Sequence, residues 1–133
     1  MSQIHWKSAV NADFNTAGDW STGTVPGASD DAILDAAGGA FTVSTSTGET
    51  VNSIQLASNA TLSLGGGTTF QAVSGTGAGA NAGVIDVNNN STFLVGSTVT
   101  NSGTIALTSV GNATRFELSA SMVLRDRLKN MAG

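Results

Sequence analysis

The chain has 133 residues, a net charge of −4 and only 11% charged residues, so it has no basic surface to attract nucleic acid or anionic lipid. It contains no cysteine, which excludes disulfides, zinc–thiolate sites and thiol nucleophiles. Ala, Ser, Thr, Gly and Asn fill 79 positions, whereas Val, Ile, Leu and Phe fill only 30. These proportions suit neither a disordered chain nor a thick two-layer core. They indicate one domain, residues 1–133, with a thin core repeated along an axis.

Membrane insertion is not expected, because no stretch approaches the roughly 20 apolar residues of a membrane span. The N-terminal stretch MSQIHWKSAV also lacks the apolar core of a secretion signal.

Residues 1–30 hold both tryptophans, Trp6 and Trp20, together with Phe14, the single histidine and the single proline. The stretches between the aromatic residues are typical of turns. A stack of strands must cover its first edge or leave unpaired N–H and C=O groups. We therefore expect this segment to be an aromatic N-terminal cap.

Residues 31–120 contain short runs in which apolar and polar residues alternate, as in half-buried strands. Between these runs lie mainly Gly, Asn, Ser, Thr and Ala, which suit tight corners. The runs are DAILDA, FTVST, VNSIQL, ATLSL, TTFQAV, GVIDV, STFLV, GTIAL, TRFEL and, just beyond residue 120, MVL. This pattern predicts an all-β fold, a β-solenoid of about four coils.

The spacing of two runs supports the solenoid. Ile85 in GVIDV recurs as Ile105 in GTIAL, and this interval has the length expected for one β-helical turn. The interval from Ile54 to Ile85 is longer, and we attribute the excess to a corner loop over residues 74–82. Asparagines such as Asn101 follow several runs, where they suit corners and stacked amide ladders.

Residues 121–133 allow two interpretations. Leu124, Leu128 and Met131 have helical spacing, Ser121 is a candidate N-cap, and charges of both signs alternate. A short amphipathic helix covering the last coil is one expectation. In the other, MVL ends the last coil and the rest is a tail.

The candidate site residues are few. His5 has no second histidine or cysteine to complete a metal site, so a surface role is favoured. Asp30, Asp31 and Asp35 form the densest carboxylate group and are weak calcium candidates, but their spacing matches no established calcium loop, so we favour turn capping. No catalytic residue and no cofactor are assigned.

Catalysis on this scaffold would require converging carboxylates, as in glycoside hydrolysis. Asp86 and Glu117 are expected to point outward, and they lie too far apart to cooperate if their strands occupy different faces. Arg115 and Glu117 form a surface pair of little energetic weight. The glycine-rich stretches lack the Lys-Ser or Lys-Thr of a phosphate loop.

The run FNTAGDWSTGTVPGASDDAIL, followed by FTVST, ETVNSIQL, NATLSL, GVIDV, STFLV, VTNSGTIAL and GNATRFEL, resembles the N-terminal, repeat-bearing part of bacterial surface and secreted β-helix proteins. These include autotransporter-like adhesin passengers and alphaproteobacterial proteins exported by type I secretion. The resemblance spans about residues 6–118, and its most specific element is W-x5-P-x3-DDA, from Trp20 to Ala32. After Leu118 the chain departs from the family pattern.

The resemblance implies a right-handed parallel β-helix that is secreted or held at the bacterial cell surface. We expect a non-enzymatic structural or adhesive module that associates with copies of itself in fibres or matrix, or that binds glycans or a host surface. The alternative is a carbohydrate-binding or carbohydrate-active β-helix.

Overall fold

The computed structural model describes residues 2–65, 67–88, 91–108, 115–118, 122–124 and 127–130. These residues form short β-strands and one 3-10 helix, η1 (Ala17–Asp19). The strands, in chain order, are β1 (Ser2–His5), β2 (Ala12–Asp13), β3 (Asp30–Leu34), β4 (Phe41–Thr45), β5 (Glu49–Val51), β6 (Ser53–Leu56), β7 (Ala60–Leu64), β8 (Thr69–Ala72), β9 (Val84–Asn88), β10 (Thr92–Val95), β11 (Val99–Asn101), β12 (Thr104–Thr108), β13 (Arg115–Leu118), β14 (Met122–Leu124) and β15 (Arg127–Asn130).

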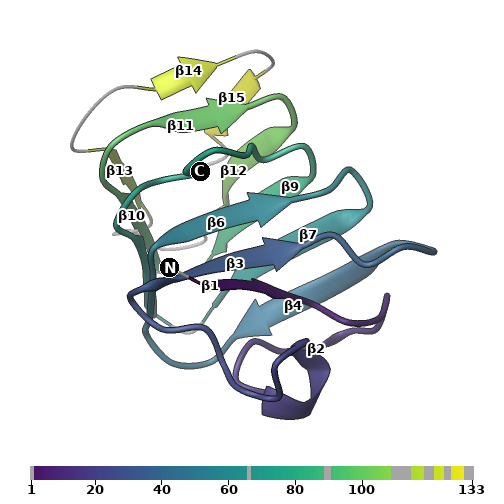
Figure 1. Ribbon diagram of the computed structural model, residues 1–133. Coiled ribbons are helices and arrows are strands. Elements are labelled where there is room, and N and C mark those ends of the chain that lie inside the picture. The colour runs from purple at the N-terminus through teal and green to yellow at the C-terminus, as the bar shows by residue number, and fades with distance from the viewer. Residues whose placement is uncertain are drawn as a thin grey trace.

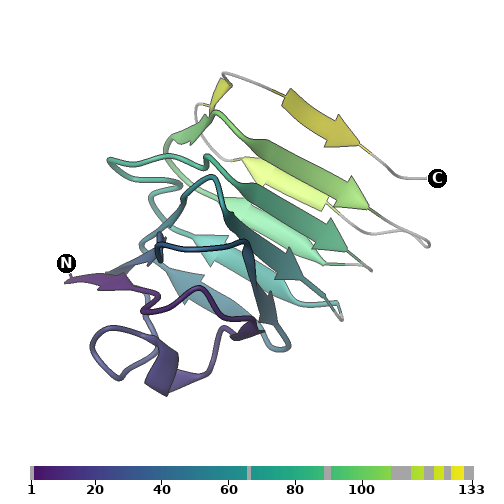
Figure 2. The ribbon, with the colours of Figure 1, turned by 90° about the vertical axis from the view of Figure 1, so that its right-hand side faces the viewer.

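The strands stack into three walls. The first wall holds β1-β3-β6 and β11-β14, which are joined through bridges at Asn81. The second wall is β15-β12-β9-β7-β4-β2, and the third is β13-β10-β8-β5. All paired strands named here are parallel, and successive strands along the chain usually lie in different walls. The chain is therefore a β-solenoid of about three turns, with its colours rising in order along the axis (Figures 1 and 2).

Alternation along each strand places every second side chain in the core. In the second wall, Leu62, Ile85 and Ile105 pair in register, and each is 0% exposed. In the third wall, Phe70 and Phe93 pair in register, with ring centroids 6.2 Å apart. Burial of each such side chain contributes about 1.5–3 kcal/mol. Inward side chains at equivalent positions of successive turns thus stack in files along the axis, and these files form the thin core that the composition indicates.

The predicted step of one turn from Ile85 to Ile105 is confirmed, because these residues pair directly on β9 and β12. The predicted equivalence of Ile54 and Ile85 is wrong. Ile54 pairs with Ala32 in the first wall, whereas Ile85 pairs with Leu62 of the second wall. Similar apolar patterns on β6 and β7 made the choice between the two runs ambiguous.

Residues 74–82 do hold the excess length, since the stretch from Leu56 to its partner Asn81 is longer than that from Asn81 to Asn101 and residues 73–78 are turn. The predicted position is wrong, because these residues lie in the first wall between β6 and β11 and not at a corner. The amide of Ile54 donates to the carbonyl of Gly75 at 3.0 Å, and that of Leu56 donates to Ala80 at 3.1 Å. On the other side, the amide of Asn81 donates to the carbonyl of Thr100 at 2.9 Å. The stretch satisfies its backbone groups against both neighbours, so it is part of the wall despite its small residues.

The residues predicted as the cap include two paired strands. β1 pairs with β3 in the first wall, and β2 pairs with β4 in the second. η1 and its neighbours lie at the same end of the stack as β2 (Figure 1). Trp6, Phe14 and Trp20 are at most 1% exposed.

The C-terminal helix proposed for residues 121–133 is not what the described residues of that stretch form. Residues 122–124 are β14 and residues 127–130 are β15. β15 pairs with β12, with Leu128 opposite Ile105. The outer edge of β12 offers unpaired backbone N–H and C=O groups, and pairing with them outweighs the helical spacing of the apolar residues.

Candidate functional site: the outer face of the first wall

The outer face of the first wall near the end of β3 brings together the polar groups that the sequence singles out. Along β3, Ala32 and Leu34 point inward and are 0% exposed, and Ala36 beyond the strand is 6% exposed. Residues 31, 33 and 35 therefore face outward. His5 of β1 lies beside Ile33 in the parallel register. The strand pairing thus places the His5 and Asp35 side chains on one surface.

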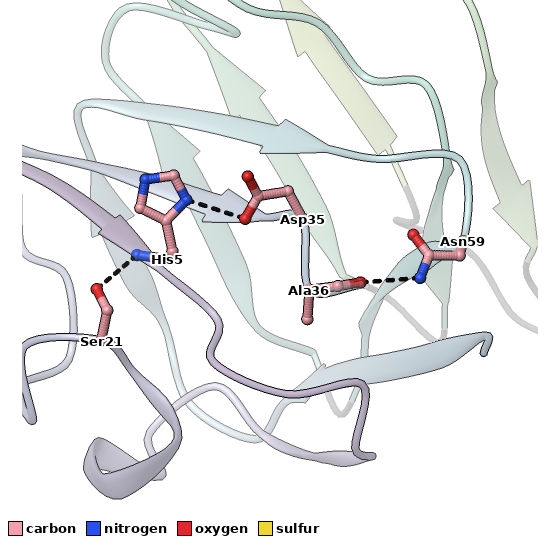
Figure 3. Close-up of polar contacts among 5 residues, drawn as sticks. All are labelled: His5, Ser21, Asp35, Ala36 and Asn59. Carbon is pink, nitrogen blue, oxygen red and sulfur yellow. Dashed lines mark hydrogen bonds and ion pairs between the residues drawn. The ribbon is translucent and has the colours of Figure 1, made fainter. Parts of the chain in front are cut away.

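The side chains of His5 and Asp35 form a hydrogen bond on this surface. Nδ1 of His5 lies 2.9 Å from Oδ1 of Asp35, and the two side chains are 42% and 45% exposed. Figure 3 shows the imidazole turned toward Asp35 and away from Ser21. The Ser21 hydroxyl instead accepts a hydrogen bond from the His5 backbone amide at 3.0 Å. Because that hydroxyl does not face the imidazole, these three residues do not form a Ser-His-Asp nucleophile arrangement.

A shallow pocket of about 220 Å³ lies next to this hydrogen-bonded pair. Ile33, Asp35, Gln55, Leu56, Ala57 and Ala80 line it. Ile33 is only 8% exposed although it faces outward, so it gives the pocket an apolar floor. Asp35 and Gln55 supply polar groups. This combination suits a small polar ligand with one apolar face.

The three predicted calcium candidates are each engaged in separate contacts. Oδ2 of Asp30 accepts from the Gly27 amide at 2.9 Å, which is the turn capping favoured from the sequence. Oδ1 of Asp31 accepts from Asn52 Nδ2 and Ser53 Oγ, both at 2.7 Å. Asp35 contacts His5. Within the described ranges, no three His, Asp or Glu side chains lie close enough together to hold a metal ion.

Asparagines satisfy polar groups between turns, both at corners and within the first wall. Nδ2 of Asn59 donates to the carbonyl of Ala36 at 3.0 Å (Figure 3). It also donates to the carbonyl of Gly39 at 3.0 Å. Asn81 and Asn101 are 0% exposed, and Nδ2 of Asn81 donates to Oδ1 of Asn101 at 2.8 Å. The predicted amide ladder is therefore present, but sequence reasoning missed Asn81. The signal that identifies it is the Asn-x-Gly of residues 81–83, which recurs one turn later at residues 101–103.

The carboxylates considered for catalysis are divided between walls. β9, which carries Asp86, belongs to the second wall, and β13, which carries Arg115 and Glu117, belongs to the third. The side chains of Arg115 and Glu117 lie outside the described part of the chain.

Comparison with known proteins finds no match to a protein-family model, a curated protein or a solved structure. Among the residues that the structure describes, no helix is long and apolar enough to cross a membrane.

Proposed function

We propose that this chain is a non-enzymatic structural module, a stiff β-solenoid that acts in adhesion or matrix formation in a bacterial secreted or cell-surface protein. One observation carries the proposal: the walls are in register from turn to turn, so outward side chains form straight files. In the second wall, Thr42, Thr61, Val84 and Thr104 are aligned in one file. Successive members lie about 4.8 Å apart.

The file beside it supports an interaction role. Ser44, Ser63, Asp86 and Ala106 pair in register, so from β4 to β12 Asp86 is the one ionisable residue in these two files. Small hydroxyl-bearing side chains on a nearly uncharged sheet hydrogen-bond without strong repulsion between like surfaces. Such a face suits lateral contact with a second copy or with a glycan chain.

The finer architecture belongs to the same proposal. We infer a right-handed winding, since crossovers between parallel strands of one sheet are right-handed in about 98% of cases. We also infer an N-terminal cap built on Trp6, Phe14 and Trp20, whereas the turns number about three and not the four coils expected from the sequence. The cap is supported by edge-to-face contacts of the Trp20 ring with Trp6 and Phe14, at 4.9 and 5.0 Å between centroids.

Self-association is tested by sedimentation velocity across a concentration series. We expect the wild-type mass to rise with concentration and the Thr42→Lys/Thr61→Lys variant to stay monomeric, because added like charges repel across a lateral contact. Thr50→Lys/Thr69→Lys is the matched control, since both residues are exposed in the third wall. A wild type that stays monomeric throughout would contradict the proposal.

The carbohydrate-binding alternative is favoured by the pocket beside Asp35, whose polar rim and apolar floor suit one sugar ring. It is disfavoured by the aromatic residues, because all those whose burial is described are at most 2% exposed and offer no stacking platform. A glycan array probed with the wild type and with Gln55→Ala separates the two functions. Binding that Gln55→Ala abolishes would support the alternative, and no binding would leave the structural role.

A further inference from the structure

The pocket beside Asp35 is a hollow in the outer layer of the first wall. Ile33 and Gln55 are outward neighbours on β3 and β6. Next to them, the pocket is lined by Ala57 and Ala80, whose side chains are single methyl groups. Because these side chains are shorter than their neighbours, a space of about 220 Å³ remains above them.

The backbone around the hollow is already hydrogen-bonded. The Ala57 amide donates to the Leu34 carbonyl at 2.9 Å, and the Leu56 amide donates to the Ala80 carbonyl at 3.1 Å. The pocket is therefore a feature of the paired wall. Since these backbone groups are engaged, a ligand has to be recognised mainly by side chains.

Asp35 supplies a carboxylate at the rim. Nδ1 of His5 contacts Oδ1 of Asp35 at 2.9 Å, and the other carboxylate oxygen, Oδ2, takes no part in this contact (Figure 3). The Asp35 side chain is 45% exposed, so Oδ2 is open to a ligand. A neutral imidazole donates its N–H and leaves the negative charge of the carboxylate in place. Asp35 therefore offers an anionic acceptor.

A relay of hydrogen bonds determines which end of the Gln55 amide is available. Ser53 Oγ donates its single proton to Asp31 Oδ1 at 2.7 Å. In its 3.2 Å contact with Gln55, the same hydroxyl must then accept from Nε2. The carbonyl oxygen Oε1 is left for a ligand. Gly79 leaves room for it, because a Cβ there would lie 2.2 Å from Oε1.

The two polar side chains of the pocket thus present acceptors, which favours a ligand that donates hydrogen bonds. The same strand carries two further carboxylates, Asp30 and Asp31, and no Lys or Arg is among the described residues that line the pocket. Charge complementarity therefore favours a cation. A metal ion is disfavoured, because within the described part of the chain no three His, Asp or Glu side chains gather.

The remaining lining selects the kind of organic cation. Ile33 and Leu56 form an apolar floor on which an alkyl chain can exclude water. The volume is below the roughly 300–1,000 Å³ of sites for drug-sized ligands, so the ligand has few atoms. With Oδ1 of Asp35 held by His5, one carboxylate oxygen is open. A single-point ammonium suits it better than a guanidinium fork, which binds two oxygens.

We propose that this pocket binds a primary ammonium group carried on a short alkyl chain, the chemistry of small amines and of the lysine side chain. The ammonium donates to Asp35 Oδ2 and Gln55 Oε1, and the alkyl chain lies over Ile33 and Leu56. The assignment requires neither self-association nor sugar binding, so it fails or holds independently of them.

The test is a titration of the 15N-labelled protein with n-butylammonium at about pH 8, where an alkylammonium remains protonated and imidazole is mostly neutral. Concentrations up to about 100 mM are used, because so small a ligand binds weakly. We expect saturable shifts of the Asp35, Gln55 and Ala57 amide signals. 1-Butanol, which has the same chain without the charge, should bind at least about tenfold more weakly.

Two variants assign the polar contacts. Asp35→Asn should weaken binding about tenfold or more, because it removes a charged acceptor. Gly79→Ala keeps the charge but places a Cβ where Gln55 Oε1 lies, so it should weaken binding about two- to tenfold. The matched control, Asp86→Asn, removes one negative charge from the second wall and should leave the affinity unchanged. An unshifted Ile85 amide signal shows that each variant is folded.

Three results would overturn the proposal: no saturable shift with n-butylammonium, equal binding of 1-butanol, or equal weakening by Asp35→Asn and Asp86→Asn. A methyl hexoside that shifts these signals where n-butylammonium does not would also overturn it, in favour of the carbohydrate alternative. Nα-acetyl-lysine methylamide distinguishes the sources of the ammonium. Binding as tight as that of n-butylammonium supports a lysine side chain as the ligand, and binding at least about tenfold weaker supports a free amine.

Discussion

At the scale of single residues, Glu49 is, among the ionisable side chains that the structure describes, the one whose environment most clearly opposes its charge. Burial raises the pKa of its carboxyl above the ordinary value of 4.5, and repulsion from Asp13 adds to the rise. Hydrogen bonds from Thr47 and Asn15 act in the opposite direction and only partly offset burial. The folded state therefore binds a proton at this site more readily than the unfolded state does.

This pKa shift predicts a pH dependence of stability. With a raised folded-state pKa, the contribution of Glu49 is fully present below pH 4.5 and is lost as the pH rises through the folded pKa. Glu49→Gln, which is neutral at every pH, should raise the melting temperature at pH 7 and change it less at pH 4. Thermal unfolding followed by circular dichroism at both pH values measures the difference. If Glu49→Gln changed the melting temperature equally at the two pH values, the raised pKa of Glu49 would be contradicted. Thr47→Val removes a hydrogen bond that lowers the Glu49 pKa, so in that background the effect of Glu49→Gln at pH 7 should exceed its effect at pH 4 by more.

At the scale of elements, strand positions were largely predictable because inward residues alternate with polar ones. FTVST, ATLSL and GVIDV correspond closely to β4, β7 and β9. β5 was missed as an independent strand, since Glu49-Thr50-Val51 contains one large apolar residue. β15 was missed because RLKN suits a helix as well as a strand. A strand with two or more inward apolar residues can be predicted from its own sequence. A strand with fewer, such as β5, becomes a strand because it pairs with a neighbouring turn.

Candidate contacts were less predictable than strands, because they depend on which runs become neighbours. The contact between His5 and Asp35 joins residues far apart in the chain, and it follows from the pairing of β1 with β3. Glycines carry a similar hidden constraint. A Cβ at Gly83 would lie 2.1 Å from the Ala60 carbonyl oxygen, and one at Gly103 would lie 2.1 Å from that of Gly83. Residue type identifies these glycines as corner residues, but only the stacking explains why the corner admits no side chain.

At the scale of the whole molecule, the walls determine which segments tolerate change. In a solenoid each turn contacts only its neighbours, so an insertion that leaves the walls aligned costs mainly loop entropy. Gly67 meets this condition, since it is exposed, has φ +72° and has no atom within 4 Å of an added Cβ. Residues 74–82 look like a similar glycine-rich loop in sequence, but they connect β6 to β11 by backbone hydrogen bonds.

A matched pair of insertions distinguishes a corner from a wall. Gly-Ser inserted after Gly67 should cost less than about 1 kcal/mol, because lengthening a flexible loop is a small entropic change. The Ala80 carbonyl accepts from the Leu56 amide, and the Asn81 amide donates to the Thr100 carbonyl. The same insertion between Ala80 and Asn81 pulls these two groups apart and displaces the buried Asn81 side chain from Asn101. Each buried polar group left unpaired costs about 1–3 kcal/mol, so the loss should reach several kcal/mol. Urea unfolding midpoints measure both, and equal losses would mean that residues 74–82 are a corner loop after all.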